Sequence, residues 1–227
     1  MSRKITIFIA GDSTAATKQP DKKPETGWGE RLPDFFTDQV EFDNKAANGR
    51  SSKSFINEGR LQQVADAIRE GDFFFIQFGH NDEKPREDLY TEPSTTYKDY
   101  LKQYINVARQ AGAHPVLLNS IHRRAFDEAG RITDSHGSYP SAVRELANEL
   151  SVPFIDMTER SRRLLEETGE EPSQAFFLWL QPGEHPNYPE GVQDNTHFSE
   201  NGALEMARLV ADGIRELQLQ PLVQLMK

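Results

Sequence analysis

The chain of 227 residues contains no cysteine. This absence excludes a disulfide framework, a thiolate metal site and a cysteine nucleophile, so serine, histidine and carboxylates must carry any chemistry. Basic residues are in the minority, because 26 Lys and Arg stand against 36 Asp and Glu, for a formal net charge of −10. This balance argues against nucleic-acid or acidic-membrane partners, since a polyanion needs a broad basic field on the protein.

Long hydrophobic runs are also missing. No apolar stretch approaches the roughly 18 residues of a membrane span. The segment MSRKITIFIAGDS has a charged start but too short an apolar run for a secretory signal peptide, and cleavage near Ala10 would remove an expected strand. We therefore expect a cytoplasmic protein without a membrane partner.

The order of apolar and amphipathic segments predicts an α/β fold. Short apolar strands that alternate with helical periodicity are typical of a parallel sheet covered on both faces. We expect one domain over residues 1–227, a three-layer α/β/α sandwich around a mostly parallel five-stranded sheet. The expected strands are Lys4–Ala10, Val40–Asn44, Asp72–Phe78, Pro115–Asn119 and Val152–Asp156, and the expected helices are Ser54–Arg69, Ser94–Ala111, Ser138–Leu150, Thr158–Thr168 and Ser199–Leu217.

Polar motifs stand at the ends of the expected strands. GDS follows the first strand, NKAANGRSS the second and FGHND the third, while DNTH precedes the last helix. The stretch Leu180–Gly202 is rich in Pro and Asn, and we expect it to be an irregular functional loop. Because open α/β sheets bind ligands off the carboxyl ends of their strands, we expect these four segments to converge on one edge.

These segments hold the groups that a hydroxyl nucleophile requires, namely a base, a group that orients the base, and donors for an oxyanion. Ser13 can be the nucleophile and His197 the base, while Asp194, three residues earlier, can orient the imidazole. The backbone N–H groups of Ser13 and Gly49 and the side-chain amide of Asn81 are candidate oxyanion donors. Glycine suits this task because, without Cβ, it can turn its amide into a site.

The sequence resembles the SGNH (GDSL-type) hydrolases. It matches their four motif blocks in order, at AGDST, at the glycine of NKAANGRS, at GHND and at DNTH. It is further similar to the rhamnogalacturonan acetylesterases at TGWGE, AANGRSSKSF, HRRAFDEAGRITDSHGSYPSAVREL and PNYPEGVQDNTHFSENGA, so that the resemblance covers nearly the whole chain.

The resemblance implies a flavodoxin-like SGNH fold and the hydrolysis of an ester through an acyl-enzyme. It implies a triad of Ser13, Asp194 and His197, and an oxyanion hole formed by Ser13, Gly49 and Asn81. We expect no cofactor and no metal. The substrate that it implies is an acetylated, pectin-derived oligosaccharide, and the expected lack of a secretion signal favours an imported fragment over intact pectin.

Other residues near these motifs are candidates for contact with a sugar. Arg123 and Arg124, in HRRAF after the expected fourth strand, can bind the carboxylates of a uronate, although adjacent arginines are usually solvated or salt-bridged. Trp28 can stack on a sugar or pack in the core. We interpret Asp12, next to Ser13, as a residue that pins the turn.

Three other functions are alternatives. A broad-specificity carboxylesterase, lipase or thioesterase would share the scaffold and triad, which fix the ester chemistry but not the acyl group or alcohol. A sugar-binding module without catalysis would use Trp28, Tyr139 and Tyr188 as aromatic platforms and would need no triad. A metal-dependent phosphoesterase is disfavoured because the first strand ends in Gly-Asp-Ser rather than Asp-x-His, although the chain offers the hard ligands Asp12, His80, Asp82, Asp194 and His197.

Overall fold

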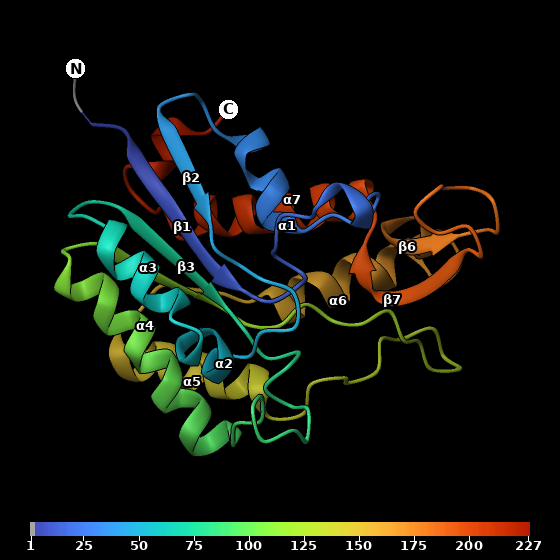
Figure 1. The fold of residues 1–227 in the computed structure, drawn as a ribbon, viewed down its shortest axis with the longest axis horizontal. Coiled ribbons are helices and arrows are strands. Elements are labelled where there is room, and N and C mark those ends of the chain that lie inside the picture. Colours follow the sequence, from blue (N-terminus) through green and yellow to red (C-terminus); the bar gives the residue numbers. More distant parts are fainter. Residues whose placement is uncertain (1–2) are drawn as a thin grey trace.

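A five-stranded sheet forms the middle layer of the structure, a computed structural model that describes residues 3–227 (Figure 1). All neighbouring strands pair in parallel, in the order β2-β1-β3-β4-β5. The predicted parallel α/β/α arrangement is confirmed, while residues 1 and 2 of the domain predicted over 1–227 lie outside the described residues. The strands are β1 (Ile5–Gly11), β2 (Val40–Asn44), β3 (Phe73–Gln77), β4 (His114–Leu118) and β5 (Phe154–Ile155).

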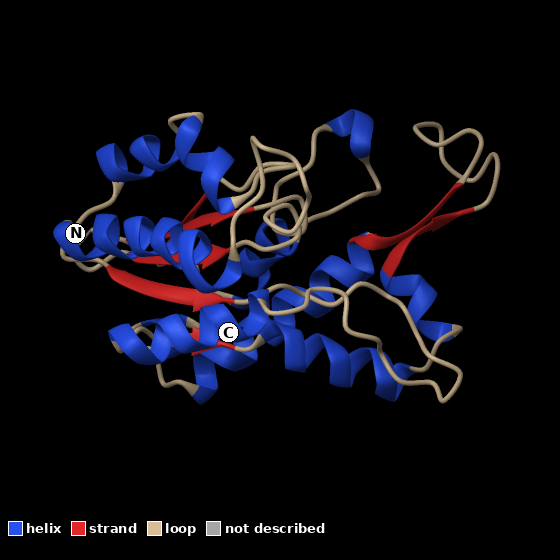
Figure 2. Cartoon of the chain, turned by 90° about the horizontal axis from the view of Figure 1, so that it is seen from below, coloured by secondary structure: helices blue, strands red, loops and turns tan. Residues whose placement is uncertain are grey.

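Helices cover both faces of this sheet (Figure 2). Successive strand residues point to opposite faces, so Ile7 and Ile9 of β1 belong to one buried apolar cluster and Phe8 and Ala10 to the other. The first cluster includes α1 (Trp28–Arg31), α6 (Met157–Thr168) and α7 (Glu200–Glu216), and the second includes α2 (Ser52–Asn57), α3 (Arg60–Ala67), α4 (Lys98–Gln110) and α5 (Tyr139–Leu150). Strands buried on both faces give the loops at their carboxyl ends a rigid base.

Two predicted helices differ from the structure. The segment Ser54–Arg69 is divided into α2 and α3, because Gly59 adopts a φ of +73° between them. The segment Ser94–Ala111 begins with a π-helical turn before α4. The short helical turns are η1 (Pro20–Lys22), η2 (Leu32–Phe35), η3 (Pro93–Tyr97), η4 (Pro172–Phe176) and η5 (Leu222–Leu225). Among the helices within residues 3–227, none is both long and apolar enough to cross a bilayer.

A separate hairpin stands beside the main sheet. Strands β6 (Phe177–Leu180) and β7 (Val192–Phe198) pair in antiparallel fashion, and the hairpin extends away from the five parallel strands (Figures 1 and 2). The prediction of an irregular loop over Leu180–Gly202 is therefore wrong for β7. This strand has a polar sequence and is mostly half-buried, so it lacks the apolar run that identified the strands of the main sheet.

Candidate active site

Ser13 lies in the turn that follows β1, and Asp12 holds this turn. Asp12 Oδ1 accepts hydrogen bonds from the backbone N–H of Thr14 at 2.9 Å and from its hydroxyl at 2.7 Å. Burial by itself raises the pKa of the Asp12 carboxyl, but the contacts with His80 and Thr14 outweigh burial and lower this pKa to about 2. The interpretation of Asp12 as a residue that pins the turn is confirmed.

The hairpin brings Asp194 and His197 of β7 to Ser13. His197 Nε2 lies 2.9 Å from Ser13 Oγ, and His197 Nδ1 lies 2.7 Å from Asp194 Oδ2. Burial raises the pKa of Asp194, but hydrogen bonds from the His197 ring and from two backbone N–H groups lower it to about 2. The ionised carboxylate can therefore hold the imidazole in the orientation that accepts a proton from the serine hydroxyl.

The three candidate oxyanion donors belong to residues that line one pocket. The backbone N–H groups of Ser13 and Gly49 donate no hydrogen bond within residues 3–227, and Gly49 has a φ of +77° that favours glycine. Asn81 Nδ2 donates to the Arg50 carbonyl at 3.0 Å, and Asn81 Oδ1 accepts from Lys84 Nζ at 2.7 Å. One amide hydrogen of Asn81 is thus left to join the two backbone N–H groups as a donor to an oxyanion.

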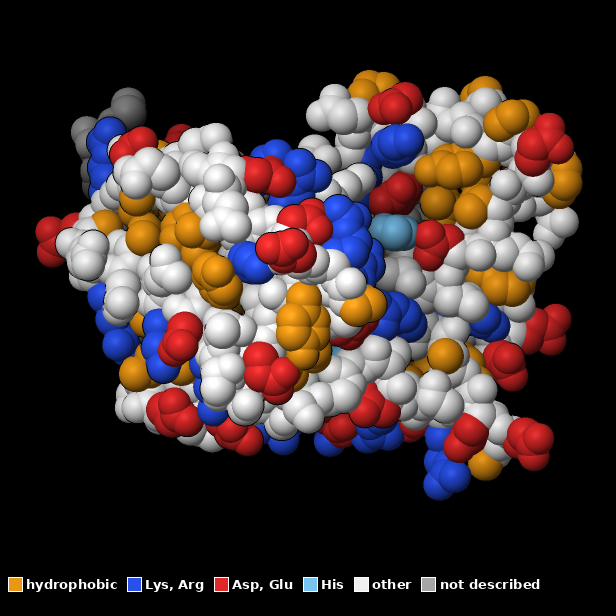
Figure 3. Space-filling view, turned by 60° about the horizontal axis from the view of Figure 1, so that its bottom comes forward, with side chains coloured by type: hydrophobic (Ala, Val, Ile, Leu, Met, Phe, Trp, Pro, Cys, Tyr) orange, Lys and Arg blue, Asp and Glu red, His pale blue; other side chains and the backbone are white. Residues whose placement is uncertain are grey.

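These five predicted residues line one pocket with a volume of about 400 Å³. Figure 3 shows a hollow that holds a histidine side chain, with acidic and basic side chains beside it. Apart from Tyr188, named only as an aromatic platform of a sugar-binding module, the remaining lining residues are not identified from the sequence, although Asn48 lies within a quoted motif and Lys84 follows GHND by two positions. Those remaining residues are Lys22, Glu25, Asn48, Lys84, Leu178, Tyr188 and Val192.

A buried lysine, Lys18, contacts three of the residues that line the pocket. Lys18 Nζ donates to the Ser13 carbonyl at 2.5 Å and to Asn48 Oδ1 at 2.7 Å, and it forms an ion pair with Glu25 at 2.7 Å. Burial lowers the pKa of Lys18, and the carboxylate of Glu25 opposes this shift. One ammonium group therefore joins the serine turn to the loop that carries Gly49. No sequence pattern indicates this role of Lys18, because its partners lie on three separate segments.

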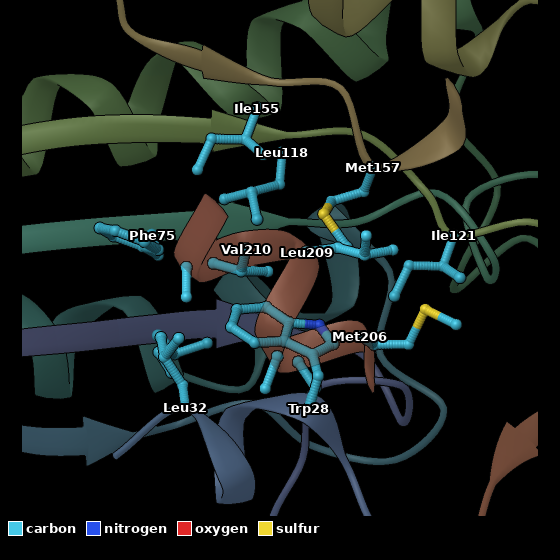
Figure 4. Close-up of a cluster of buried hydrophobic side chains, with 14 of the residues drawn as sticks. Trp28, Leu32, Phe75, Leu118, Ile121, Ile155, Met157, Met206, Leu209 and Val210 are labelled. Carbon is cyan, nitrogen blue, oxygen red and sulfur yellow. The ribbon is translucent and has the colours of Figure 1, made fainter. Parts of the chain in front are cut away.

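Trp28 does not reach the pocket. Its side chain is fully buried within the apolar cluster next to α7, among Leu32, Met206 and Val210 (Figure 4). Its Nε1 donates to Gln77 Oε1 at 3.0 Å, which satisfies the one polar atom of the ring. The hypothesis that Trp28 stacks on a sugar is corrected by this burial, and the alternative of core packing is confirmed.

The two candidate arginines are also absent from the pocket lining. Arg123 forms an ion pair with Glu83 and donates to the Ser135 carbonyl at 2.7 Å. Arg124 is only 5% exposed and donates to the Glu170 carbonyl and to Ser173 Oγ. Their guanidinium groups therefore bind other parts of the chain, a use that the sequence could not reveal because the partners are 12 to 71 positions away.

The carboxylates considered as metal ligands lie in separate hydrogen-bonded groups. Asp12 Oδ2 faces His80 Nδ1 at 3.3 Å, whereas Asp82 accepts bonds from Ser52 and Thr91. Burial raises the pKa of Asp82 to about 7, although the bonds from Ser52 and Thr91 oppose this shift. Within the described residues, no group of three or more His, Asp or Glu side chains is placed to hold a metal ion.

Comparison with solved structures agrees with this fold. A Bacillus subtilis protein, YxiM, superposes with a TM-score of 0.82 at 24% identity, over 96% of this chain and 58% of that longer one. A putative GDSL-like lipase from Parabacteroides merdae superposes with a TM-score of 0.67 at 14% identity, over 94% of this chain and 96% of that one. At these identities the likeness concerns the fold alone.

Sequence comparison identifies nearer relatives. The chain is 49% identical to the rhamnogalacturonan acetylesterase RhgT of Bacillus subtilis, over 96% of this chain and 93% of that protein. It is 43% identical to a probable rhamnogalacturonan acetylesterase, YesY, of the same organism, over 94% of each. Residues 7–210 match the family described as GDSL-like lipase/acylhydrolase. The chain belongs to this GDSL-like lipase/acylhydrolase family and is a hydrolase of carboxylic esters.

Proposed function

We propose that the protein is a serine esterase that removes O-acetyl groups from rhamnogalacturonan-derived oligosaccharides. Ser13 is the nucleophile, His197 the general base and Asp194 the group that orients the imidazole. The observation that carries this proposal is the continuous chain of contacts from Ser13 Oγ to His197 Nε2 at 2.9 Å and from His197 Nδ1 to Asp194 at 2.7 Å.

In the first half-reaction, Ser13 Oγ attacks the acetyl carbonyl carbon while His197 Nε2 accepts the hydroxyl proton. The carbonyl oxygen gains negative charge and is stabilised by the N–H groups of Ser13, Gly49 and Asn81. The intermediate then breaks its bond to the sugar oxygen, and His197 donates its proton to that oxygen. The products are a free sugar hydroxyl and an acetyl ester on the serine.

In the second half-reaction, a water molecule replaces the sugar. His197 Nε2 accepts a proton from this water as the water oxygen attacks the acetyl carbon of the acyl-enzyme. The same N–H groups stabilise the second oxyanion. When the intermediate collapses, Ser13 Oγ recovers its proton from His197 and acetate leaves.

The choice of substrate rests on the relatives and on the pocket. Two relatives at 43% identity or more carry the name rhamnogalacturonan acetylesterase, one of them as probable. A volume of about 400 Å³ lies within the roughly 300–1,000 Å³ of small-molecule sites, and most of the lining residues are polar or charged. Such a lining suits the hydroxyl groups of a sugar better than a long acyl chain. The proposed reaction is a step in pectin degradation.

An acetate-release assay tests this proposal. We expect the highest kcat/KM on acetylated rhamnogalacturonan oligosaccharides, with lower values on acetylated xylo-oligosaccharides and on long-chain 4-nitrophenyl esters. A preference for the long-chain esters would contradict the proposed substrate and favour a broad carboxylesterase on the same triad.

A further inference from the structure

Lys84 occupies an unusual position in the pocket. Its ammonium group donates to Asn81 Oδ1 at 2.7 Å, which leaves two of its three N–H groups available to a ligand. The side chain is exposed and lines the pocket. Within residues 3–227, no carboxylate lies at ion-pair distance from Lys84, whereas the neighbouring Arg50 is paired with Glu58 at 2.9 Å.

The acidic groups of the pocket are already engaged. Glu25 is paired with the buried Lys18 at 2.7 Å, and the other lining carboxylate, Asp194, accepts the contact from His197 described above. The other lining cation, Lys22, faces Asp21 at the long distance of 3.9 Å. The pocket therefore offers positive charge without a close counter-ion, in a protein whose net charge is −10. An anionic ligand overcomes the unfavourable global field only through such a local one.

We propose that Lys84 binds the carboxylate of the uronate ring whose acetyl ester enters the candidate oxyanion hole. The proposal rests on the function proposed above and names the part of the substrate that this residue recognises. The carboxylate and the acetylated hydroxyl belong to one six-membered ring, and Lys84 contacts the same amide that donates to the oxyanion. One sugar ring can therefore contact Lys84 through its carboxylate and the candidate oxyanion donors through its acetyl ester.

The arginines expected to recognise a uronate are in a different position. The guanidinium of Arg123 is engaged by Glu83, and that of Arg124 by groups of the chain interior. Neither lines the pocket that holds Ser13. Lys84 thus contacts Asn81, a proposed oxyanion donor, and still has two N–H groups available to a ligand.

The test compares two substrates that differ only in the charge of their uronate carboxyl groups. One is an acetylated galacturonate oligosaccharide, and the other is the same oligosaccharide with its carboxylates methyl-esterified. Acetate release gives kcat/KM for each, and the ratio of the two values measures recognition of the carboxylate. Any general loss caused by movement of Asn81 affects both substrates and cancels in this ratio.

We expect the wild-type protein to prefer the free acid, and Lys84→Met to lower the ratio by about tenfold or more, since hydrogen bonds between charged groups are the strong ones. Lys84→Arg retains the charge and should preserve most of the preference. The matched control is Lys4→Met, which removes the same charge from an exposed position before β1, at the opposite edge of the sheet. This control should keep the wild-type ratio.

Two results would overturn the proposal that Lys84 binds the carboxylate. An equal loss on both substrates in Lys84→Met, with the ratio unchanged, would show that the lysine only positions Asn81 and would overturn the proposal. If Lys84→Met does not fold, the wild-type ratio measured at rising ionic strength replaces it, because an exposed ion pair weakens as salt increases. A ratio that is insensitive to salt would then overturn the proposal.

The wild-type data separate this proposal from the proposed function. Equal rates on the free acid and the methyl ester would refute recognition by Lys84 and leave the deacetylase function intact. Hydrolysis of 4-nitrophenyl acetate without acetate release from either oligosaccharide would instead refute the proposed substrate, and with it the role of Lys84.

Discussion

The ammonium group of Lys18 donates a hydrogen bond to the backbone carbonyl of Ser13, 2.5 Å away. The lysine side chain is only 1% exposed, and its ion-pair partner Glu25 is 10% exposed. The carbonyl of Ser13 is therefore held in place by the ammonium group of Lys18, to which water has little access. Such a charge stabilises the fold only while all its partners are present.

We expect Lys18→Met to lower the free energy of unfolding by about 3–5 kcal/mol, because it leaves a buried carboxylate without its partner. Chemical denaturation measures this loss. The matched control is Lys102→Met, which breaks the exposed pair with Asp99 at 3.0 Å and should cost about 1 kcal/mol or less. Equal losses in the two variants would contradict the structural role of Lys18.

Ser13→Ala should keep the fold and lose nearly all esterase activity. Removal of a triad member typically leaves only about 10³–10⁴-fold catalysis over water, from binding and oxyanion contacts. The kcat on an acetate ester and the circular dichroism spectrum measure the two properties. Ser141→Ala, at an exposed position on α5, serves as the control and should match the wild type. A Ser13→Ala protein with near wild-type kcat would remove this residue from the mechanism.

Asn81→Ala should lower kcat by about 10²–10³ and change KM much less, because the amide contact gains strength only when charge develops on the oxygen. Steady-state kinetics on a neutral acetate ester separate the two parameters. Asn148→Ala, an exposed asparagine on α5, is the matched control. A variant at position 81 with an unchanged kcat would show that the oxyanion is stabilised by other groups.

Asp82 should make stability depend on pH. Burial raises the pKa of this carboxyl from 3.8 to about 7. Between these two pH values the folded protein therefore keeps a proton on Asp82 that the unfolded chain has lost. The contribution of Asp82 to stability is therefore complete below about pH 4 and is lost as the pH rises to about 7. We expect Asp82→Asn to remove this decline, which denaturation at several pH values measures.

The exposed Asp88, paired with Arg86, supplies the control for the pH experiment. Asp88→Asn should leave the decline in place, because water already solvates its carboxylate. A wild-type curve and an Asp82→Asn curve that run parallel between pH 4 and 7 would show that the carboxyl at position 82 is ionised in the folded protein over this range.

The residues at the strand ends could be predicted from the sequence. Ser13 and Asn81 follow β1 and β3, whose apolar runs are unmistakable, and parallel strands bring their carboxyl ends to one edge. His197 and Asp194 were found by their spacing and motif. No pattern predicts their strand, because β7 has neither a regular alternation nor an apolar run.

The partners of charged side chains are harder to predict from the sequence than the catalytic motifs are. Arg124 looks exposed in HRRAF, yet its partners Ser173 and Glu170 lie more than 40 positions away. Lys18 and Lys84 carry no local pattern that separates them from ordinary surface lysines. The partner of a long cation depends on which distant segments pack together, and a single sequence gives no direct measure of that packing.

The triad contacts join two parts of the fold that differ in how deeply they are buried. Ser13 follows a strand buried on both faces, whereas Asp194 and His197 belong to a two-stranded hairpin that meets the body through contacts such as the Thr26–Phe198 backbone bond at 3.0 Å. The hairpin buries Phe177, Leu178 and Phe198, but its other strand residues are half-buried or exposed, and segments with few buried contacts open locally before the whole domain unfolds. The two tryptophans report on these events independently, since Trp28 lies in the core and Trp179 on β6. On gentle heating, the fluorescence of a Trp28→Phe protein should therefore change together with thermal inactivation, while that of a Trp179→Phe protein changes only at the later collapse of the core.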